Sequence, residues 1–295
     1  MTTQEGAAAV QPTGSPAAID AWVERERRAI DALLDARLPA PSAEGPTGGD
    51  PGRLIEAMRY SLLAPGKRLR PLLALAAAEA VGGESRRADE AVQAACCAVE
   101  LVHCYSLIHD DLPAMDDDDF RRGRPSNHKA FGEATAILAG DALLTLAFEW
   151  IAEGGQGARA GAHVRAALAL ARGAGMRGMV RGQARDLGEA APVTILALEQ
   201  LHAEKTAALF RAAVEIGGAV AGAGERQMRA LGASGERFGV AFQHADDLDD
   251  ADQPALAGAA RERLGALVAE AEEALAPLGA RAARLTALAQ AVGRR

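Results

Sequence analysis

The sequence has few aromatic residues and no excess of positive charge. Phe, Trp and Tyr make up 3% of its 295 residues, and 32 Lys and Arg stand against 40 Asp and Glu, for a formal charge of −8. Phosphate contacts need clustered positive charge and base stacking needs aromatic rings, so we expect no nucleic-acid partner. With 49% apolar residues, the chain is too apolar to be disordered throughout.

The sequence also shows no signal for a membrane or for secretion. We find no apolar run close to the ~18–20 residues of a membrane span, and therefore expect none. The first residues, MTTQEGAAAVQPTG, have neither the basic start nor the apolar core of a signal peptide. The three cysteines (Cys96, Cys97 and Cys104) match no zinc or disulfide pattern. We therefore expect a cytoplasmic protein with buried, reduced cysteines.

Alanine is abundant, whereas β-branched and aromatic residues are scarce. Because alanine is the best helix former and strands favour β-branched and aromatic side chains, we predict an all-α protein of nine or ten helices without a strand. Residues 1–16 are of low complexity and are expected to be disordered. Residues 17–295 contain no linker and should form one domain, a helical bundle. The stretches 193–217 and 254–291 are each predicted as one continuous segment.

Two clusters of carboxylates indicate chemistry. The first is HDDLPAMDDDD at 109–119 and the second is QHADDLDD at 243–250. Each follows an apolar stretch, which argues against the common alternative of a solvated acidic face. So many neighbouring carboxylates raise one another's pKa unless a cation compensates, and hard oxygen ligands suit Mg²⁺. Pro113 should end the first helix and let Asp110 and Asp116 converge, while Asp246 and Asp250 share one helix face.

Basic residues accompany these clusters. GKRLRP at 66–71 precedes a helix whose positive end, with Lys67 and Arg70, would hold an anion, and FRRGRP at 120–125 follows the first cluster. Acidic clusters with separate basic groups are typical of a polyphosphate bridged by Mg²⁺. The alternative is a salt-bridge network between these runs. A Gly-rich P-loop is missing, so an ordinary nucleotide is not favoured.

In this combination and order, the motifs resemble the trans-isoprenyl diphosphate synthase (polyprenyl synthetase) family, most of all the bacterial farnesyl diphosphate synthases. The stretches that carry the resemblance are GKRLRP, HCYSLIHDDLPAMDDDDFRRGRPSNHKAFGEATAILAGDALLTLAFE, GQARDLGE, HAEKTAALFRAAVEIG and FQHADDLDD. The resemblance implies the isoprenoid synthase fold, an all-α bundle around a central cavity, usually as a homodimer. It also implies Mg²⁺-dependent condensation of isopentenyl diphosphate with an allylic diphosphate (dimethylallyl or geranyl diphosphate), with three ions assembled on the diphosphate.

The resemblance assigns roles to individual residues. Isopentenyl diphosphate would be bound by Gly66, Lys67, Arg70 and His103, with help from Arg122. Arg121 would bind the allylic diphosphate. Near this diphosphate and the developing cation would stand Lys205, Thr206 and Gln243. The predicted catalytic residues are therefore Arg121, Lys205 and Gln243. Gln183 and Asp186 would line the same cavity. The predicted metal ligands are Asp110, Asp116 and Asp246, supported by Asp111, Asp247 and Asp250.

Product length is predicted from the helix before the first cluster. Tyr105 and Ser106 lie about one turn deeper than Asp110, where an aromatic side chain in such enzymes limits the chain. Tyr105 therefore favours a C15 product, farnesyl diphosphate. Geranylgeranyl or geranyl diphosphate is the alternative, and Tyr105 is then only a core aromatic residue.

One departure from the family pattern follows Asp250. A closing loop of some twenty residues with a phosphate-binding lysine is expected there, but the sequence passes directly to ADQPALAG. A slower synthase, one that uses its C-terminal Arg294 and Arg295 as a lid, or a catalytically weak regulatory paralogue would each fit. A terpene cyclase would not need the second diphosphate site of GKRLRP and RRG, and a helical scaffold would not need two metal motifs.

Overall fold

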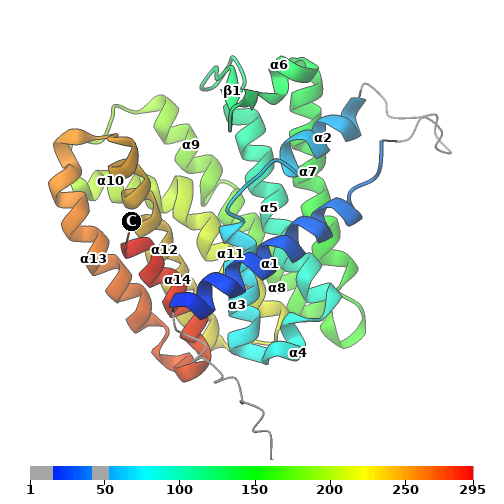
Figure 1. The fold of residues 1–295 in the computed structure, drawn as a ribbon, viewed down its shortest axis with the longest axis vertical. Coiled ribbons are helices and arrows are strands. Elements are labelled where there is room, and N and C mark those ends of the chain that lie inside the picture. Colours follow the sequence, from blue (N-terminus) through cyan, green and yellow to red (C-terminus); the bar gives the residue numbers. More distant parts are fainter. Residues whose placement is uncertain (1–15, 42–52, 295) are drawn as a thin grey trace, which may run out of the picture.

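The computed structural model of the chain describes residues 16–41 and 53–294, and these are almost entirely helical (Figure 1). The predicted disordered segment 1–16 therefore lies outside the described residues, except for Pro16 at the start of the first helix. The helices are α1 (Pro16–Arg37), α2 (Leu54–Leu62), α3 (Leu69–Gly82), α4 (Glu84–Arg87), α5 (Glu90–Asp110), α6 (Asn127–Phe131), α7 (Glu133–Glu153), α8 (Ala160–Ala174), α9 (Met179–Gly188), α10 (Ile195–His202), α11 (Ala208–Val220), α12 (Glu225–Asp250), α13 (Ala257–Ala274) and α14 (Ala283–Gly293). The prediction of an all-α bundle is confirmed.

The core of the bundle is built on α3, α5 and α11 (Figure 1). These helices are apolar on most sides, which is the pattern of a helix surrounded by other helices. Small residues let them approach closely. A side chain at Gly217 of α11 would place its Cβ 1.9 Å from the carbonyl oxygen of Ala74 in α3. The abundance of alanine and glycine thus allows close helix packing around the site.

Strand structure occurs where none was predicted. Phe120–Arg121 (β1) pairs antiparallel with Arg124–Pro125 (β2). The connecting Arg122 and Gly123 both have positive φ, 53° and 74°, as a two-residue type I′ hairpin turn requires. This tight turn folds the basic segment back against the first acidic cluster.

The two long stretches predicted as continuous differ in outcome. The first is helical without a gap from Ile195 to Val220, but a π-helical turn (η3, Ala203–Ala207) separates α10 from α11. The second contains a 3-10 turn (η4, Pro254–Leu256), α13, a 3-10 segment (η5, Ala276–Ala282) and α14. Pro277 lacks an amide donor and Gly279 has φ 58°, so a regular helix cannot pass through η5.

Two helices, α5 and α7, are long and apolar enough to cross a membrane by length and composition alone, so the chain does contain runs of that kind. This is weak evidence, because the core helix of a soluble protein passes the same test. The tested window of α5 is 78% buried within the fold. That of α7 is 39% buried, and Ile137 and Leu138 are exposed on it.

Candidate active site

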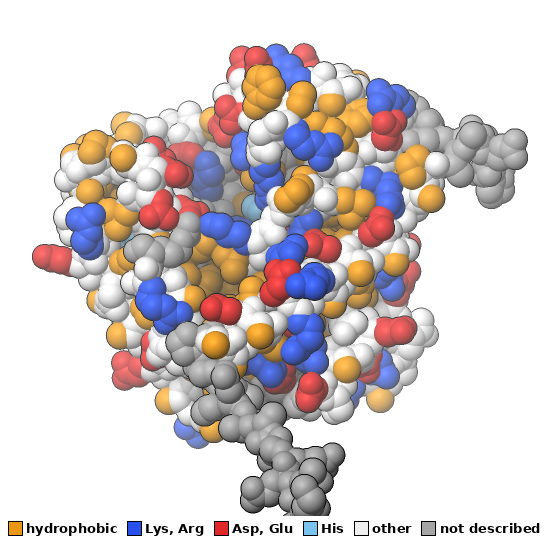
Figure 2. All heavy atoms as spheres, viewed as in Figure 1, with side chains coloured by type: hydrophobic (Ala, Val, Ile, Leu, Met, Phe, Trp, Pro, Cys, Tyr) orange, Lys and Arg blue, Asp and Glu red, His pale blue; other side chains and the backbone are white. Residues whose placement is uncertain are grey.

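A cavity of about 980 Å³ opens between α5, α9, α12 and the segment before α3. Figure 2 shows this face hollowed, with acidic and basic side chains gathered around the opening. Of the residues predicted for the site, the structure places these in its wall: Gly66, Lys67, Arg70, His103, Tyr105, Ser106, Asp110, Arg121, Arg122, Gln183, Lys205, Thr206, Gln243 and Asp246. The predicted residues outside the wall are Asp111, Asp116, Asp186, Asp247 and Asp250.

One carboxylate from each acidic cluster lines the cavity. Asp110 is the last residue of α5, and Asp246 lies in the last turns of α12. Burial raises the pKa of Asp110 to about 6, and the neighbouring Asp116 and Asp111 act in the same direction. Crowding of negative charge in a partly buried wall is relieved by a bound cation. The oxygen donors and their charge therefore fit Mg²⁺.

The turn after α5 brings Asp116 back toward Asp110. The helix ends at Asp110, three residues before Pro113, and the amide of Asp116 donates a hydrogen bond of 2.8 Å to the carbonyl of Asp110. The neighbouring Asp111 points elsewhere: it is buried and accepts a bond of 2.6 Å from Nε of Arg121. Adjacent carboxylates of one motif thus have different surroundings.

The three cationic residues of the GKRLRP segment have two different surroundings. Arg68 is 4% exposed, pairs with Asp31 and Glu100, and donates to two backbone carbonyls, so it holds the segment in place. Lys67 is largely exposed, with Nζ 4.0 Å from Oδ1 of Asp246. Arg70 lines the cavity against the ring of Phe210, and burial lowers its pKa to about 10, which still leaves it charged at neutral pH.

A neutral histidine stands among these cations. Burial lowers the pKa of His103 well below its usual value, and Arg70, Arg122, Arg68 and Arg121 reinforce the shift. At pH 7 its imidazole can therefore donate one N–H to an anion without adding charge. Arg122 is fixed across the cavity mouth by a 2.9 Å bond from its guanidinium to the carbonyl of Pro65. Together these groups form a basic wall.

The π-helical turn η3 supplies the wall on the other side. Such turns displace side chains from the regular helical positions and occur often at functional sites. Lys205 in this turn donates to Asp186 of α9, and Thr206 donates to the side-chain oxygen of Gln243 at 3.0 Å. A Cβ on Gly182 of α9 would lie 2.2 Å from the amide of Lys205, so that glycine lets α9 lie directly on the turn.

The deep part of the cavity is more apolar. Tyr105 is 7% exposed and packs edge-on against His109, with ring centroids 5.6 Å apart. Met179 and Leu187 of α9 and Phe242 of α12 add further apolar side chains to the cavity wall, and the sequence had not indicated them. Phe242 lies one helical turn before the predicted Asp246, and Met179 lies one helical turn before Gln183, so helical spacing from predicted residues could have indicated both.

The segment after α12 is as short in the structure as in the sequence. Ala251 takes a left-handed conformation with φ 57°, the turn η4 follows, and α13 begins at Ala257. The structure therefore has no long loop over the cavity between α12 and α13.

Comparison with known proteins gives a consistent result. A family model described as polyprenyl synthetase matches residues 51–257. The farnesyl diphosphate synthase of Geobacillus stearothermophilus is 43% identical over 235 residues, which cover 79% of this chain and 75% of that one. Geranylgeranyl pyrophosphate synthase 12 of Arabidopsis thaliana is 41% identical over 261 residues, which cover 85% of this chain and 69% of that one.

A solved structure extends the similarity to the fold. An FPP/GFPP synthase from Zymomonas mobilis matches with a TM-score of 0.82 at 39% identity, over 92% of this chain and 98% of that one. A geranyltransferase from Legionella pneumophila matches with a TM-score of 0.80 at 32% identity, over 94% and 97%. The bundle is thus an isoprenoid synthase fold. The names of these proteins include several product lengths, so identity at this level leaves the product open.

Proposed function

Because the chain belongs to the polyprenyl synthetase family and is thus a short-chain trans-prenyltransferase, we propose that it condenses isopentenyl diphosphate with dimethylallyl or geranyl diphosphate to release farnesyl diphosphate. The observation that carries the proposal is the pairing, in one cavity, of Asp110 and Asp246 with the separate basic group of Lys67, Arg70 and His103. Two charged subsites suit two diphosphate substrates.

The acidic subsite would hold the allylic diphosphate. Asp110, Asp116 and Asp246 would bind Mg²⁺, and bound ions would neutralise the diphosphate and favour its departure as pyrophosphate. Asp111 and Asp247 contact Arg121 and His202 instead, so they, like Asp250, would support these ions only indirectly from outside the cavity wall. Three ions is the number we propose. Arg121, held by its bond to Asp111, would contact the same diphosphate.

The basic subsite would hold isopentenyl diphosphate. Arg70 and Lys67 supply charge, neutral His103 supplies an N–H, and Arg122 would reach the diphosphate from the mouth. Gly66 allows this close approach, since a Cβ there would lie 3.0 Å from the guanidinium of Arg122. Fixing both substrates in one cavity places the alkene near the allylic C1 and supplies most of the orientation that the reaction needs.

The developing allylic cation would lie against η3. Lys205, Thr206 and Gln243 would present dipoles to this part of the cavity. Gln183 joins them from α9, which packs directly on η3, and Asp186 accepts the bond from Lys205 just outside the wall. Preorganised dipoles stabilise charge without reorganisation cost. The apolar lining of Met179, Phe242 and their neighbours would keep water away.

Tyr105 supports the C15 product, with Ser106 beside it. It lies in the buried wall one turn below Asp110, where a growing chain would meet its ring. We expect purified protein with isopentenyl diphosphate and geranyl diphosphate to give farnesyl diphosphate, and Tyr105→Ala to give longer products. A C20 product from the wild type would contradict this proposal and identify the protein as a geranylgeranyl diphosphate synthase. If Tyr105→Ala gave products of unchanged length, Tyr105 would not determine the chain length.

The short α12–α13 connection leads to a second proposal about rate. Without a long loop at this position, the enzyme would cover its substrates less completely, so we expect turnover slower than that of synthases that have such a loop. Steady-state turnover measured beside the Geobacillus enzyme tests this, and an equal rate would contradict it. Absence of any activity with dimethylallyl, geranyl and farnesyl diphosphates would favour a regulatory paralogue instead.

We also propose a homodimer located in the cytoplasm. Apolar side chains are exposed on α7 (Ile137 and Leu138) and on the following α8 (Val164 and Leu168). An exposed apolar surface on helices is typical of a subunit interface. Sedimentation of the purified chain tests this, and a monomer at micromolar concentration would contradict it.

A further inference from the structure

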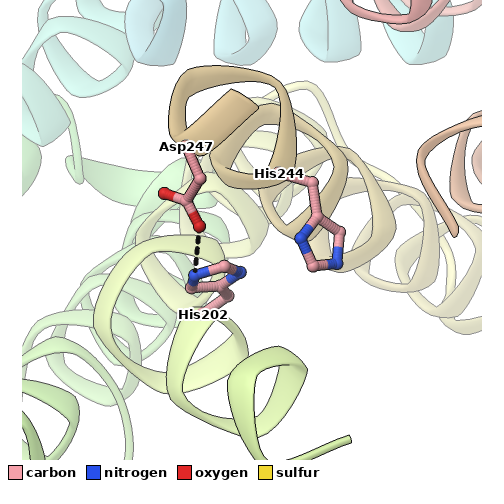
Figure 3. Close-up of side chains that lie close together, drawn as sticks. All are labelled: His202, His244 and Asp247. Atoms are coloured by element: carbon pink, nitrogen blue, oxygen red, sulfur yellow. Dashed lines mark ion pairs between the residues drawn. The ribbon is translucent and has the colours of Figure 1, made fainter. Parts of the chain in front are cut away.

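Two histidines and an aspartate meet on the side of the second acidic cluster that lies outside the cavity wall. His202 ends α10, and His244 and Asp247 lie one turn apart on α12 (Figure 3). All three are buried, with 6%, 0% and 7% of their surfaces exposed. One donor atom from each lies within 4.8 Å of the other two.

Several atoms of this cluster have no hydrogen-bond partner among the described residues. They are Nδ1 of His202, Nδ1 of His244 and Oδ2 of Asp247. Oδ2 of Asp247 contacts Nε2 of His202 at 3.1 Å, a contact that lowers the pKa of the Asp247 carboxyl, but the two atoms do not form a hydrogen bond of regular geometry. Buried polar atoms are nearly always bonded, so three in one place call for an explanation.

The other atoms of the same side chains are held from outside. Nε2 of His244 contacts Glu199 at 3.4 Å, and Glu199 in turn accepts a 2.7 Å bond from Arg263 of α13. Oδ1 of Asp247 accepts a 2.8 Å bond from Gln243. A neutral imidazole that donates from Nε2 carries its lone pair on Nδ1, and Figure 3 shows a ring nitrogen of His244 on the side facing His202 and Asp247.

A carboxylate behind a histidine is the usual arrangement around a metal-bound imidazole, where it fixes the ring and increases its basicity. Donors that share a tetrahedral Zn²⁺ ion at about 2.0–2.1 Å lie roughly 3.3 Å apart. The 3.1 Å between His202 and Asp247 is close to this value. The widest pair would close by about 1.5 Å, which a modest side-chain rotation provides.

We propose that His202, His244 and Asp247 form a binding site for a divalent transition-metal ion of the Zn²⁺ class, separate from the Mg²⁺ ions of the acidic cavity. Two imidazoles and one carboxylate suit such an ion, whereas Mg²⁺ prefers oxygen donors alone. Three protein ligands leave one position for water. The ion would join the end of α10 to the last turns of α12, and through Glu199 to α13, directly behind the helix turn that presents Asp246 to the cavity.

The proposal does not depend on the reaction that the cavity performs, and its test is a binding measurement. Full-length protein freed of metal by a chelator is titrated with Zn²⁺ by calorimetry in excess Mg²⁺, which occupies the acidic clusters. We expect one Zn²⁺ per chain and a higher melting temperature. His244→Gln should weaken Zn²⁺ binding at least 100-fold, and Glu199→Gln by 10–100-fold because it removes the outer carboxylate. His163→Gln, at another buried histidine, is the matched control and should bind as wild type.

X-ray absorption of the Zn²⁺-loaded wild type keeps the proposal testable if His244→Gln does not fold. We expect a coordination shell with two imidazoles. An all-oxygen shell would overturn the proposal, as would unchanged Zn²⁺ binding in His244→Gln or loss of binding in Asp110→Asn, which would locate the ion in the cavity. Prenyltransferase activity in Mg²⁺ alone is measured in parallel, so failure of the zinc site leaves the proposed function unaffected.

Discussion

Replacing Asp110 by asparagine should stabilise the metal-free protein while it impairs catalysis. Burial and the carboxylates of Asp116 and Asp111 raise the pKa of Asp110 from 3.8 to about 6. At neutral pH the protein therefore contains a charge that its surroundings disfavour. The shift corresponds to about 3 kcal/mol at 1.36 kcal/mol per pKa unit, and to about 2–3 kcal/mol after allowance for partial exposure.

The pH dependence follows from the direction of the shift. The folded state holds the Asp110 proton more tightly than the unfolded state, so this group lowers the free energy of unfolding as pH rises from about 4 to about 6. Its full cost is present above pH 6 and vanishes below the unfolded pKa of 3.8. Asparagine, neutral and of similar shape, avoids that cost. At pH 7.5 we expect Asp110→Asn to melt roughly 4–8 °C above wild type in EDTA.

Melting curves by circular dichroism at pH 7.5 and at the lowest pH at which both proteins remain folded test this expectation. The difference should shrink toward acid pH. With Mg²⁺ and a diphosphate added, the order should reverse, because only the wild type gains full binding energy. Asp20→Asn, at an exposed position of α1, is the control and should change stability by less than about 0.5 kcal/mol. An unchanged or lower melting temperature for Asp110→Asn in EDTA would refute the reasoning.

Three further substitutions test other parts of the site. Glu100→Ala leaves the buried guanidinium of Arg68 without its buried carboxylate partner, so we expect urea unfolding to show a free energy of unfolding lower by about 3 kcal/mol. Loss of the exposed Arg28–Glu24 pair on α1 should cost less than about 1 kcal/mol. Gly239→Ala places a Cβ 2.4 Å from Cα of Ala207 and should displace η3. We expect the variant to fold correctly and its kcat to fall at least tenfold. A kcat equal to that of the wild type would contradict this role of η3. Lys67→Ala removes an exposed cation and should raise KM for isopentenyl diphosphate about 10–100-fold with kcat nearly unchanged; a fall in kcat alone would assign Lys67 a different role.

The helical architecture could be predicted well from composition and spacing. The end of α5 at Asp110 was predicted from Pro113, because the effect of a proline on helix geometry is local. The β1–β2 hairpin could not be seen, since its strands of two residues have no periodicity and the turn of Arg122 and Gly123 is recognisable only by its positive φ. The π-helical turn η3 was not predicted because no Gly or Pro marks it. It lies where α9 and α12 pack against the helix.

The sequence by itself determined the family, the two acidic clusters and the basic segments, because these are consecutive residues whose chemistry needs no fold to be recognised. Only the tertiary structure decided which members of each cluster face the cavity. Neighbouring residues on a helix point about 100° apart, so the rotation of α12, set by its packing, turns Asp246 toward the cavity and Asp247 toward His202. The same holds for Arg68 and Arg70: Arg68 pairs with the buried Glu100 and with Asp31, whereas Arg70 lies in the cavity wall against Phe210.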